Sequence, residues 1–231
     1  NKADNPSNML AAAMTMKAYY FSIITDMWGE VPYSEALGSV FLPKYDAQAD
    51  IYAGIIRDLN TAANMFGQSD NLGAGDLIYK GDTGKWKKFA NSLRARLLNR
   101  AKHKNATFAG ELQTLLSNPA NLIASNSENA QMTYPDNTVN SNPIYADKYN
   151  NGRNDHAVSK TLVDLMTGDP RLPVYAELND AGIYIGQPNG DVEPNPFTAV
   201  SQIGAAFRDN PAAPSVLMTY AEVKFIMAEA N

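Results

Sequence analysis

Residues 82–104 read DTGKWKKFANSLRARLLNRAKHK, and large apolar residues recur in this segment at every third or fourth position. That spacing places them on one face of an α-helix. Asp82 stands where an N-cap is expected, because a carboxylate there accepts hydrogen bonds from the first free backbone amides. We predict a long amphipathic helix over 83–104, with an inward face of Trp86, Phe89, Ala90, Leu93, Leu97 and Ala101.

The same spacing recurs twice on the N-terminal side. Residues 6–27 open on Asn5-Pro6, an N-cap followed by proline at the first helical position. Residues 46–66 open on Asp46 as a cap and stop before Gly67, a residue type favoured just after a helix. We expect the inward faces to be Met9, Leu10, Ala13, Met16, Tyr20, Ile23, Ile24 and Met27 in the first helix, and Ile51, Ile55, Leu59, Ala62, Ala63 and Phe66 in the second.

Later in the chain the helical pattern is shorter and less regular. It indicates helices at about 108–117 and 156–167, and a last helix that begins near Pro214-Ser215. One short strand pair is expected near Val174-Tyr175 and Ile183-Tyr184.

Two long segments, 28–45 and 118–154, have no helical period, and the second is rich in asparagine. A loop as long as the second is usually functional or disordered. Because strict two-residue alternation is almost absent, the predicted fold class is all-α, a helical-repeat scaffold with long irregular loops.

Composition excludes several classes of function. The chain has 231 residues, 45% of them hydrophobic, with a net charge of −5 and a pI of about 5.0. An acidic chain of this kind matches nucleic acid poorly, and no apolar run approaches the ~20 residues of a membrane-spanning helix. The lack of cysteine excludes disulfides, Cys–zinc sites and thiol catalysis. No phosphate-binding glycine loop, zinc-protease motif or EF-hand spacing occurs, so we expect no cofactor, no metal and no nucleic-acid partner.

Both ends of the sequence suggest a piece of a longer protein. It starts at Asn1 with no signal peptide, and it ends at Asn231 inside a helical pattern that has no C-cap residue. We therefore expect residues 1–231 to be part of a single domain that continues beyond both ends.

Basic residues concentrate in the helix predicted over 83–104. Such a cluster is compatible with a nucleic-acid patch, a membrane surface or the solvated face of a packed helix. Because the rest of the chain is acidic, we predict that these side chains form ion pairs within the protein. They are Lys85, Lys87, Lys88, Arg94, Arg96, Arg100, Lys102 and Lys104.

Asp26 and Glu30 flank a Trp-Gly turn and raise the possibility of hydrolytic chemistry. A glycosidase needs two carboxyl groups across a sugar bond, often beside an aromatic ring. The alternative is that both carboxylates anchor the loop that follows the first helix.

Four blocks of sequence, taken together, resemble one family. They are TDMWGEVPYSEA at 25–36, PKYD at 43–46 with IY at 51–52, GDTGKW at 81–86 continuing as FANSLRARLLNR at 89–100, and GDPRL at 168–172 with YAEVKFIMAEA at 220–230. In order and spacing they are similar to the SusD/RagB family of outer-membrane nutrient-binding lipoproteins, in particular its SusD-like subgroup associated with starch uptake. Trp28 departs from the Tyr or Phe that is more usual at its position.

The resemblance implies a fold and a function. It implies an all-α, tetratricopeptide-like scaffold whose loops bind an oligosaccharide or polysaccharide without catalysis. It also implies a lipid anchor attached to an N-terminal cysteine outside this sequence, a location on the extracellular face of the outer membrane, and a SusC-like TonB-dependent transporter as partner. The ligand itself cannot be derived from the family motifs.

Sugar sites need aromatic faces and side chains that both donate and accept hydrogen bonds. The candidates lie in the two long loops: Trp28, Tyr33, Tyr134, Asn142, Tyr145 and Tyr149. For Trp28 and Tyr33 the alternative is packing beneath their own loop. For 118–154 the alternative is a plain surface loop, since asparagine also favours turns.

Three hypotheses for the function remain open at the level of sequence. The first is a non-catalytic glycan-binding component of an uptake complex. The second is a helical glycoside hydrolase with a carboxylate pair. The third is a helical-repeat adaptor that binds only protein.

Overall fold

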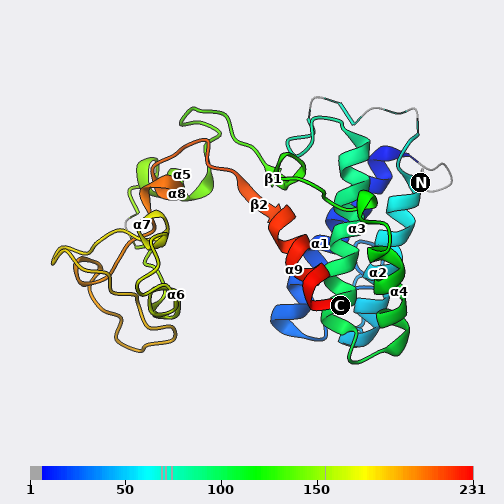
Figure 1. The fold of residues 1–231 in the computed structure, drawn as a ribbon, viewed down its shortest axis with the longest axis horizontal. Helices are drawn as coiled ribbons and strands as arrows, with labels where there is room; N and C mark the ends of the chain where they lie inside the picture. Colours follow the sequence, from blue (N-terminus) through cyan, green and yellow to red (C-terminus); the bar gives the residue numbers. More distant parts are fainter. Residues whose placement is uncertain (1–6, 69, 71, 74, 154, 231) are drawn as a thin grey trace. The chain divides into compact units, whose positions relative to one another are not determined.

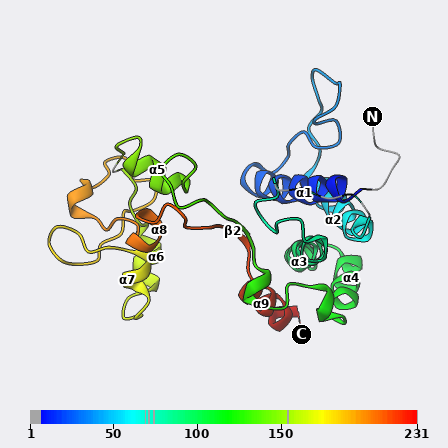
Figure 2. The same ribbon diagram turned by 90° about the horizontal axis from the view of Figure 1, so that it is seen from above.

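Among the described residues, four helices from the first half of the chain pack together with the last helix, and α3 is the central one. In the computed structural model, residues 7–68, 70, 72–73, 75–153 and 155–230 are described. Helix α3 contacts all the other helices of this group, and Figures 1 and 2 show α1 to α4 side by side. The helices are α1 (Asn8–Trp28), α2 (Gln48–Met65), α3 (Thr83–Ala101), α4 (Ala106–Leu116) and α9 (Tyr220–Ala230).

The chain divides into two compact units. Unit 1 comprises residues 1–131 and 216–231, and unit 2 comprises residues 132–215. The chain passes from one unit to the other within β1 (Ala130–Met132) and β2 (Ser215–Met218), which pair in a two-stranded sheet.

The core of unit 1 confirms the predicted inward faces of α2 and α3. Phe89, Leu93 and Leu97 are fully buried, as are Ile51 and Leu59 on α2. The predicted cap of α3 is also confirmed, because Asp82 accepts a hydrogen bond from the amide of Lys85 at 3.0 Å. These helices pack as their 3.6-residue period requires.

Helix α1 buries a face different from the predicted one. Its buried side chains are small: Asn8, Ala11, Ala12, Thr15, Ala18, Ser22 and Thr25. Met9, Tyr20 and Met27 are instead more than half exposed. Nearly every turn of this helix is apolar, so the pattern has no unique stripe, and small residues permit a closer approach to α2.

The predicted helix boundaries need two corrections in unit 1. Asn5-Pro6 lies outside the described residues, and Ser7 caps α1 by accepting a hydrogen bond from the amide of Leu10 at 3.1 Å. Asp46 does not cap α2; its carboxylate accepts hydrogen bonds from the amides of Tyr33 and Ser34, at 2.9 and 2.7 Å. It therefore fixes the end of the loop rather than the start of the helix.

The predicted internal pairing of the basic residues is confirmed for most of α3. Arg100 pairs with Asp26 at 2.6 Å, and Lys88 pairs with Glu128 at 2.6 Å. The other pairs are Arg94–Glu111, Arg96–Glu222 and Lys102–Glu229. These contacts connect α3 to α1, α4, α9 and the segment that follows α4.

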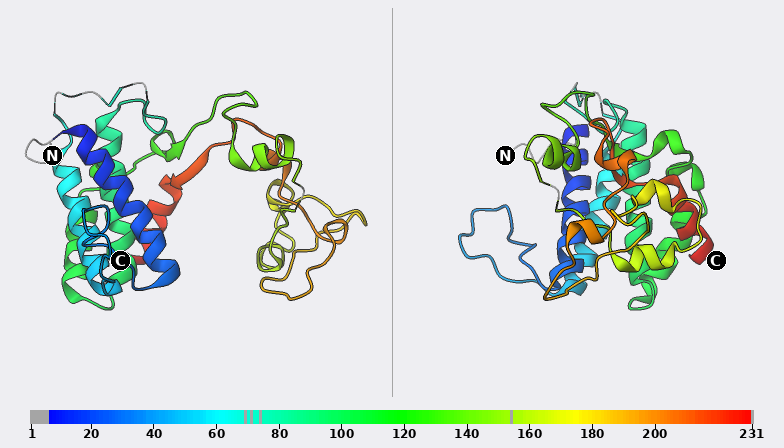
Figure 3. Two further views of the ribbon diagram at one scale, coloured as in Figure 1. Left: turned by 180° about the vertical axis from the view of Figure 1, so that it is seen from behind. Right: turned by 90° about the vertical axis from the view of Figure 1, so that its left-hand side faces the viewer.

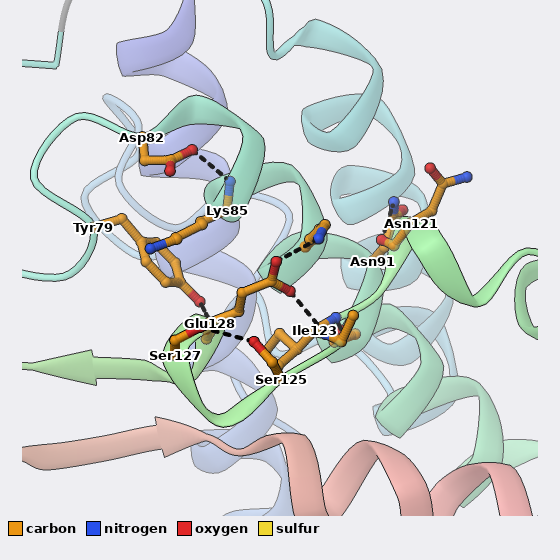
Figure 4. Close-up of polar contacts among 12 residues, drawn as sticks. Tyr79, Asp82, Lys85, Asn91, Asn121, Ile123, Ser125, Ser127 and Glu128 are labelled. Atoms are coloured by element: carbon orange, nitrogen blue, oxygen red, sulfur yellow. Dashed lines mark hydrogen bonds and ion pairs between the residues drawn. The ribbon is translucent and has the colours of Figure 1, made fainter.

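The first part of the 118–154 segment is anchored on α3 (Figure 4). It contains the short 3-10 helices η1 (Pro119–Asn121) and η2 (Asn126–Glu128). The Tyr79 hydroxyl donates to the carbonyl of Glu128 at 2.9 Å, and the amide of Ile123 donates to Ser92 Oγ at 2.9 Å. This part of the predicted loop is therefore ordered by long-range hydrogen bonds.

Unit 2 has a small apolar core and much irregular backbone. Its core consists of Val158, Val163, Met166, Leu172 and Ala176. Its elements are α5 (Pro143–Tyr149), α6 (Lys160–Leu165), α7 (Leu172–Tyr175), η3 (Phe197–Ala199) and α8 (Ala205–Arg208).

Several boundaries predicted for this half of the chain are wrong. Residues 174–175 belong to α7, and no named strand of the described residues includes 183–184, so the predicted strand pair is absent there. Residues 143–149 are helical although no period marks them, α6 is shorter than 156–167, and the segment from 215 is first a strand and then α9. In short elements such as these, tertiary contacts override local preference.

The loop between α1 and α2 carries exposed apolar side chains. The loop between α1 and α2 extends away from the helices of unit 1 in Figures 2 and 3, where it is drawn in blue. Leu37, Phe41 and Leu42 in this loop are each more than four-fifths exposed. No helix in the described residues is both long enough and apolar enough to cross a membrane.

Candidate functional site

Helix α5 places Tyr145 and Tyr149 one turn apart on the same side, which is the i, i+4 relation. Its start is built by Asn142, whose Oδ1 accepts a hydrogen bond from the amide of Ile144 at 2.8 Å. The Asn142 Nδ2 group donates to the carbonyl of Ala213 at 2.8 Å, and only 5% of the residue is exposed. Asn142 therefore holds the helix in place and presents no free amide to a ligand.

The two tyrosine rings form an aromatic surface, which we call the tyrosine platform. Their centroids are 4.5 Å apart and their planes are inclined by 31°. Tyr149 is half exposed, and Lys148 Nζ lies 4.8 Å from the centroid of its ring. An exposed ring of this kind offers an apolar face with a polar edge.

Asp209, which follows α8, holds the Tyr149 ring of the platform by a hydrogen bond from its hydroxyl. Its Oδ1 accepts hydrogen bonds from the Tyr149 hydroxyl at 3.0 Å and from Lys148 Nζ at 2.6 Å. Arg208 Nε donates to the same oxygen at 3.0 Å, while the Arg208 side chain also pairs with Glu177 at 2.7 Å. Arg208 is 8% exposed, so a buried guanidinium holds Asp209, and Asp209 in turn orients the half-exposed Tyr149.

The Arg208 guanidinium, with further hydrogen bonds from Lys148 and Tyr149, holds the pKa of Asp209 well below its usual range. A lowered pKa in the folded protein contributes stability above the ordinary carboxyl pKa near ~4, and this stability is lost as pH falls through the lowered value.

We expect Asp209→Asn to lower the free energy of unfolding by about 1–3 kcal/mol at pH 7, because it removes hydrogen bonds to a charged acceptor. The difference from wild type is smaller at about pH 3, because below the ordinary carboxyl pKa near ~4 the unfolded wild-type chain binds a proton at Asp209 while the folded protein keeps this carboxyl ionised. Urea unfolding at the two pH values measures both effects. A difference that is the same at both pH values contradicts this role of Asp209.

Amide side chains lie next to the platform on the chain. Asn150 Nδ2 donates to the carbonyl of Thr138 at 2.7 Å, and Asn151 Nδ2 donates to Asp147 Oδ1 at 3.0 Å. Both asparagines are exposed, and among the described residues their amide oxygens accept no hydrogen bond. Asp147 is also held by His156 Nε2 at 3.1 Å.

The other sequence candidates lie elsewhere. The Tyr134 hydroxyl is 2.9 Å from Ser215 Oγ, and no ring contact of the described residues joins Tyr134 to the platform. Trp28, the last residue of α1, is 66% exposed, so it does not pack beneath its loop.

Tyr33 does pack beneath that loop. It is 7% exposed, its hydroxyl donates to Asp58 at 2.7 Å, and its ring lies against Phe21 and under Lys17. A Cβ on Gly54 would stand 2.5 Å from the ring, so glycine is required there. Burial raises the pKa of Tyr33, and the residue is a structural anchor that no ligand can stack on.

Sequence reasoning missed the most exposed aromatic residues of the 28–45 loop. Phe41 is 93% exposed and Tyr45 is 70% exposed. Tyr45 lies in the PKYD block at 43–46, which carries the family resemblance but gives no reason to select this ring as a ligand contact. Phe41 has no signal in the sequence beyond being an aromatic residue in a loop of unusual length.

The structure does not support the carboxylate pair proposed for hydrolysis. Both oxygens of Asp26 are engaged, Oδ1 by the Tyr52 hydroxyl and Oδ2 by Arg100, each at 2.6 Å. Glu30 is exposed in the turn after α1. Among the described residues, no group of three or more acidic or histidine side chains is placed to hold a metal ion.

The helical scaffold presents exposed aromatic rings, and both oxygens of Asp26, one of the two carboxylates suggested for hydrolysis, are engaged within the protein. A SusD-like family, described as starch-binding and associating with the outer membrane, matches residues 1–231. The chain belongs to this SusD-like family, whose members bind without catalysis and whose fold is tetratricopeptide-like. The resemblance and the all-α fold class inferred from the sequence are thereby confirmed.

Solved structures agree. A SusD homologue from Bacteroides fragilis NCTC 9343 is 30% identical over 95% of this chain and 52% of its own, with a TM-score of 0.75. An outer membrane protein of Bacteroides vulgatus ATCC 8482, described in connection with nutrient binding, is 27% identical over 99% of this chain and 55% of its own, with a TM-score of 0.81.

A chitin-binding protein is 29% identical over 100% of this chain and 53% of its own, with a TM-score of 0.78. The chain thus spans about half the length of the solved relatives it matches. No functionally curated protein matches it.

Proposed function

We propose that this chain belongs to a cell-surface protein that binds glycans and delivers them to a transporter in the outer membrane. The observation that carries the proposal is the tyrosine platform: two rings 4.5 Å apart, held by Asp209, beside exposed amide groups. The family description, starch-binding and associating with the outer membrane, supports the ligand class and the location.

The platform suits a pyranose ring. The C–H face of the sugar stacks on the exposed ring of Tyr149, and each such contact contributes about 1 kcal/mol beyond area burial. The amide oxygens of Asn150 and Asn151 are placed near the same turn to accept hydrogen bonds from sugar hydroxyls. Tyr134 and Trp28 remain candidates for additional contacts, whereas Tyr33 and Asn142 serve the fold.

The proposal extends to the assembly. Residues 1–231 form part of a single SusD-like domain, which is about twice as long in the solved relatives. A lipid anchor on an N-terminal cysteine outside this sequence holds the protein at the extracellular face of the outer membrane. The partner is a SusC-like TonB-dependent transporter, which takes up the bound oligosaccharide.

Titration calorimetry with maltotriose and chitotriose tests the binding function. We expect at least one of them to bind with a dissociation constant of about 1 mM or tighter, and the heat to change little with salt because both sugars are neutral. We also expect no new reducing ends after prolonged incubation. Absence of heat with every glycan of a broader panel overturns the proposal, and so does turnover that disappears in Asp26→Asn.

A further inference from the structure

Unit 1 contains a cleft that the proposed function does not use. It lies where the first turn of α2, the end of α3, the start of α4 and the last turn of α1 meet, and its volume is about 780 Å³. We call it the α2–α3 cleft. It is lined by Asp26, Gln48, Ala49, Asp50, Tyr52, Ala53, Arg100, Ala101, Lys104, Asn105 and Phe108.

One wall of the cleft is fixed by an internal network. Asp26 accepts hydrogen bonds from the Tyr52 hydroxyl and from Arg100, both at 2.6 Å. These contacts hold the Tyr52 hydroxyl in place, and burial together with the Asp26 bond raises the pKa of Tyr52 to about 12. The Arg100 side chain is 52% exposed, so donors that Asp26 does not use face solvent.

Two other charged groups of the cleft have no internal role. Among the described residues, the side chains of Lys104 and Asp50 make no hydrogen bond or ion pair, and both residues are exposed. Lys104 follows α3 and Asp50 lies in the first turn of α2, so the two come from different walls. With Asp26 and Arg100 they give the lining two negative and two positive charges.

The cleft thus contains a free donor, Lys104, and a free acceptor, Asp50. The partly buried rings of Tyr52 and Phe108 line the same cleft. Balanced charge does not select an ion. A free donor and a free acceptor beside aromatic rings match a molecule whose hydroxyls both donate and accept hydrogen bonds and whose C–H face is apolar.

We propose that the α2–α3 cleft is a second glycan subsite, which takes a neutral pyranose unit through Lys104 and Asp50 and stacks it against Tyr52 and Phe108. This inference rests on the proposed glycan-binding function and adds a subsite on the helical scaffold itself.

Amide hydrogen exchange of the whole chain, with and without maltotriose or chitotriose, gives a local reading of each site. We expect slower exchange at 48–53 and 100–108 as well as at 143–151. Lys104→Ala with Asp50→Ala removes the first effect and keeps the second. A charge-matched control, Lys44→Ala with Glu30→Ala, changes exposed residues outside the cleft lining and keeps both.

The outcomes separate the two proposals. Protection at 143–151 alone overturns the cleft subsite and leaves the tyrosine platform standing. Protection at 48–53 and 100–108 alone, lost in the Lys104 and Asp50 variant, supports the cleft and overturns the platform. Protection at the cleft that disappears at high salt points to a charged ligand and overturns the neutral assignment. No protection at either place overturns both.

Discussion

Replacing Tyr145 and Tyr149 together by alanine is expected to weaken oligosaccharide binding about tenfold or more, with little change in thermal stability. Two stacking contacts of about 1 kcal/mol each correspond to more than a tenfold change in affinity. The rings lie at the surface of α5, and Tyr149 is half exposed, so their loss leaves the apolar core of unit 2 intact. Calorimetry and thermal melting measure the two quantities.

Two variants make this result specific. Tyr149→Phe keeps the ring and removes only the hydrogen bond to Asp209, so it is expected to retain most of the affinity. Tyr20 on α1 in unit 1 is 55% exposed, similar to Tyr149. The Tyr20→Ala variant removes this ring and is expected to bind the oligosaccharide as wild type does. If the double alanine variant binds as tightly as these two, the platform is not the site.

Phe89→Ala is expected to lower the free energy of unfolding of unit 1 by about 3–5 kcal/mol, the usual cost of emptying a buried aromatic position. Phe89 is fully buried on α3, and its ring centroid lies 6.0 Å from that of Trp86 and 6.4 Å from that of Tyr79. Those rings belong to the segment that precedes α3 and to its first turns. The cavity cannot close without moving them.

Urea unfolding followed by circular dichroism measures this loss. The matched control is Phe225→Ala on α9, a phenylalanine that is 76% exposed and is expected to change stability by about 0.5 kcal/mol or less. Equal effects of the two substitutions are incompatible with α3 as the centre of the core.

The helices of unit 1 show how much of the fold could be predicted. On α2 and α3, large apolar residues follow one stripe and polar residues fill the rest, so the period identifies the buried face. On α1 the stripe is not unique, because apolar residues surround the helix. The buried face of α1 is made of small residues such as Ala11, Ala18 and Ser22. A search for a stripe of large apolar residues therefore does not find it.

Two of the six candidate residues, Tyr145 and Tyr149, come together in the structure, and the sequence selects them only because they are aromatic residues in an asparagine-rich segment. Whether they bind a ligand stays a prediction, and the sequence does not reveal their geometry. Their helix depends on Asn142, which bonds to Ala213, and on Asp209, which is 60 residues from Tyr149 in the sequence. Contacts at that separation leave no periodic signal.

The ion pairs of α3 illustrate the same limit. Charge balance predicts that its basic residues find internal partners. The identity of each partner depends on which helices are neighbours, so the Arg100–Asp26 pair, 2.6 Å across two helices, appears only in the structure. That pair engages one oxygen of Asp26, and the Tyr52 hydroxyl engages the other.

Nuclear magnetic resonance of the chain with bound maltotriose or chitotriose tests the central claim most directly. Intermolecular nuclear Overhauser effects report which protein protons lie within about 5 Å of the sugar C–H groups, a range that includes a stacked ring. We expect such effects from the ring protons of Tyr149 and Tyr145, and none from Tyr33, which is buried. Sugar contacts confined to other residues, with the rings of Tyr145 and Tyr149 unaffected, would contradict the account.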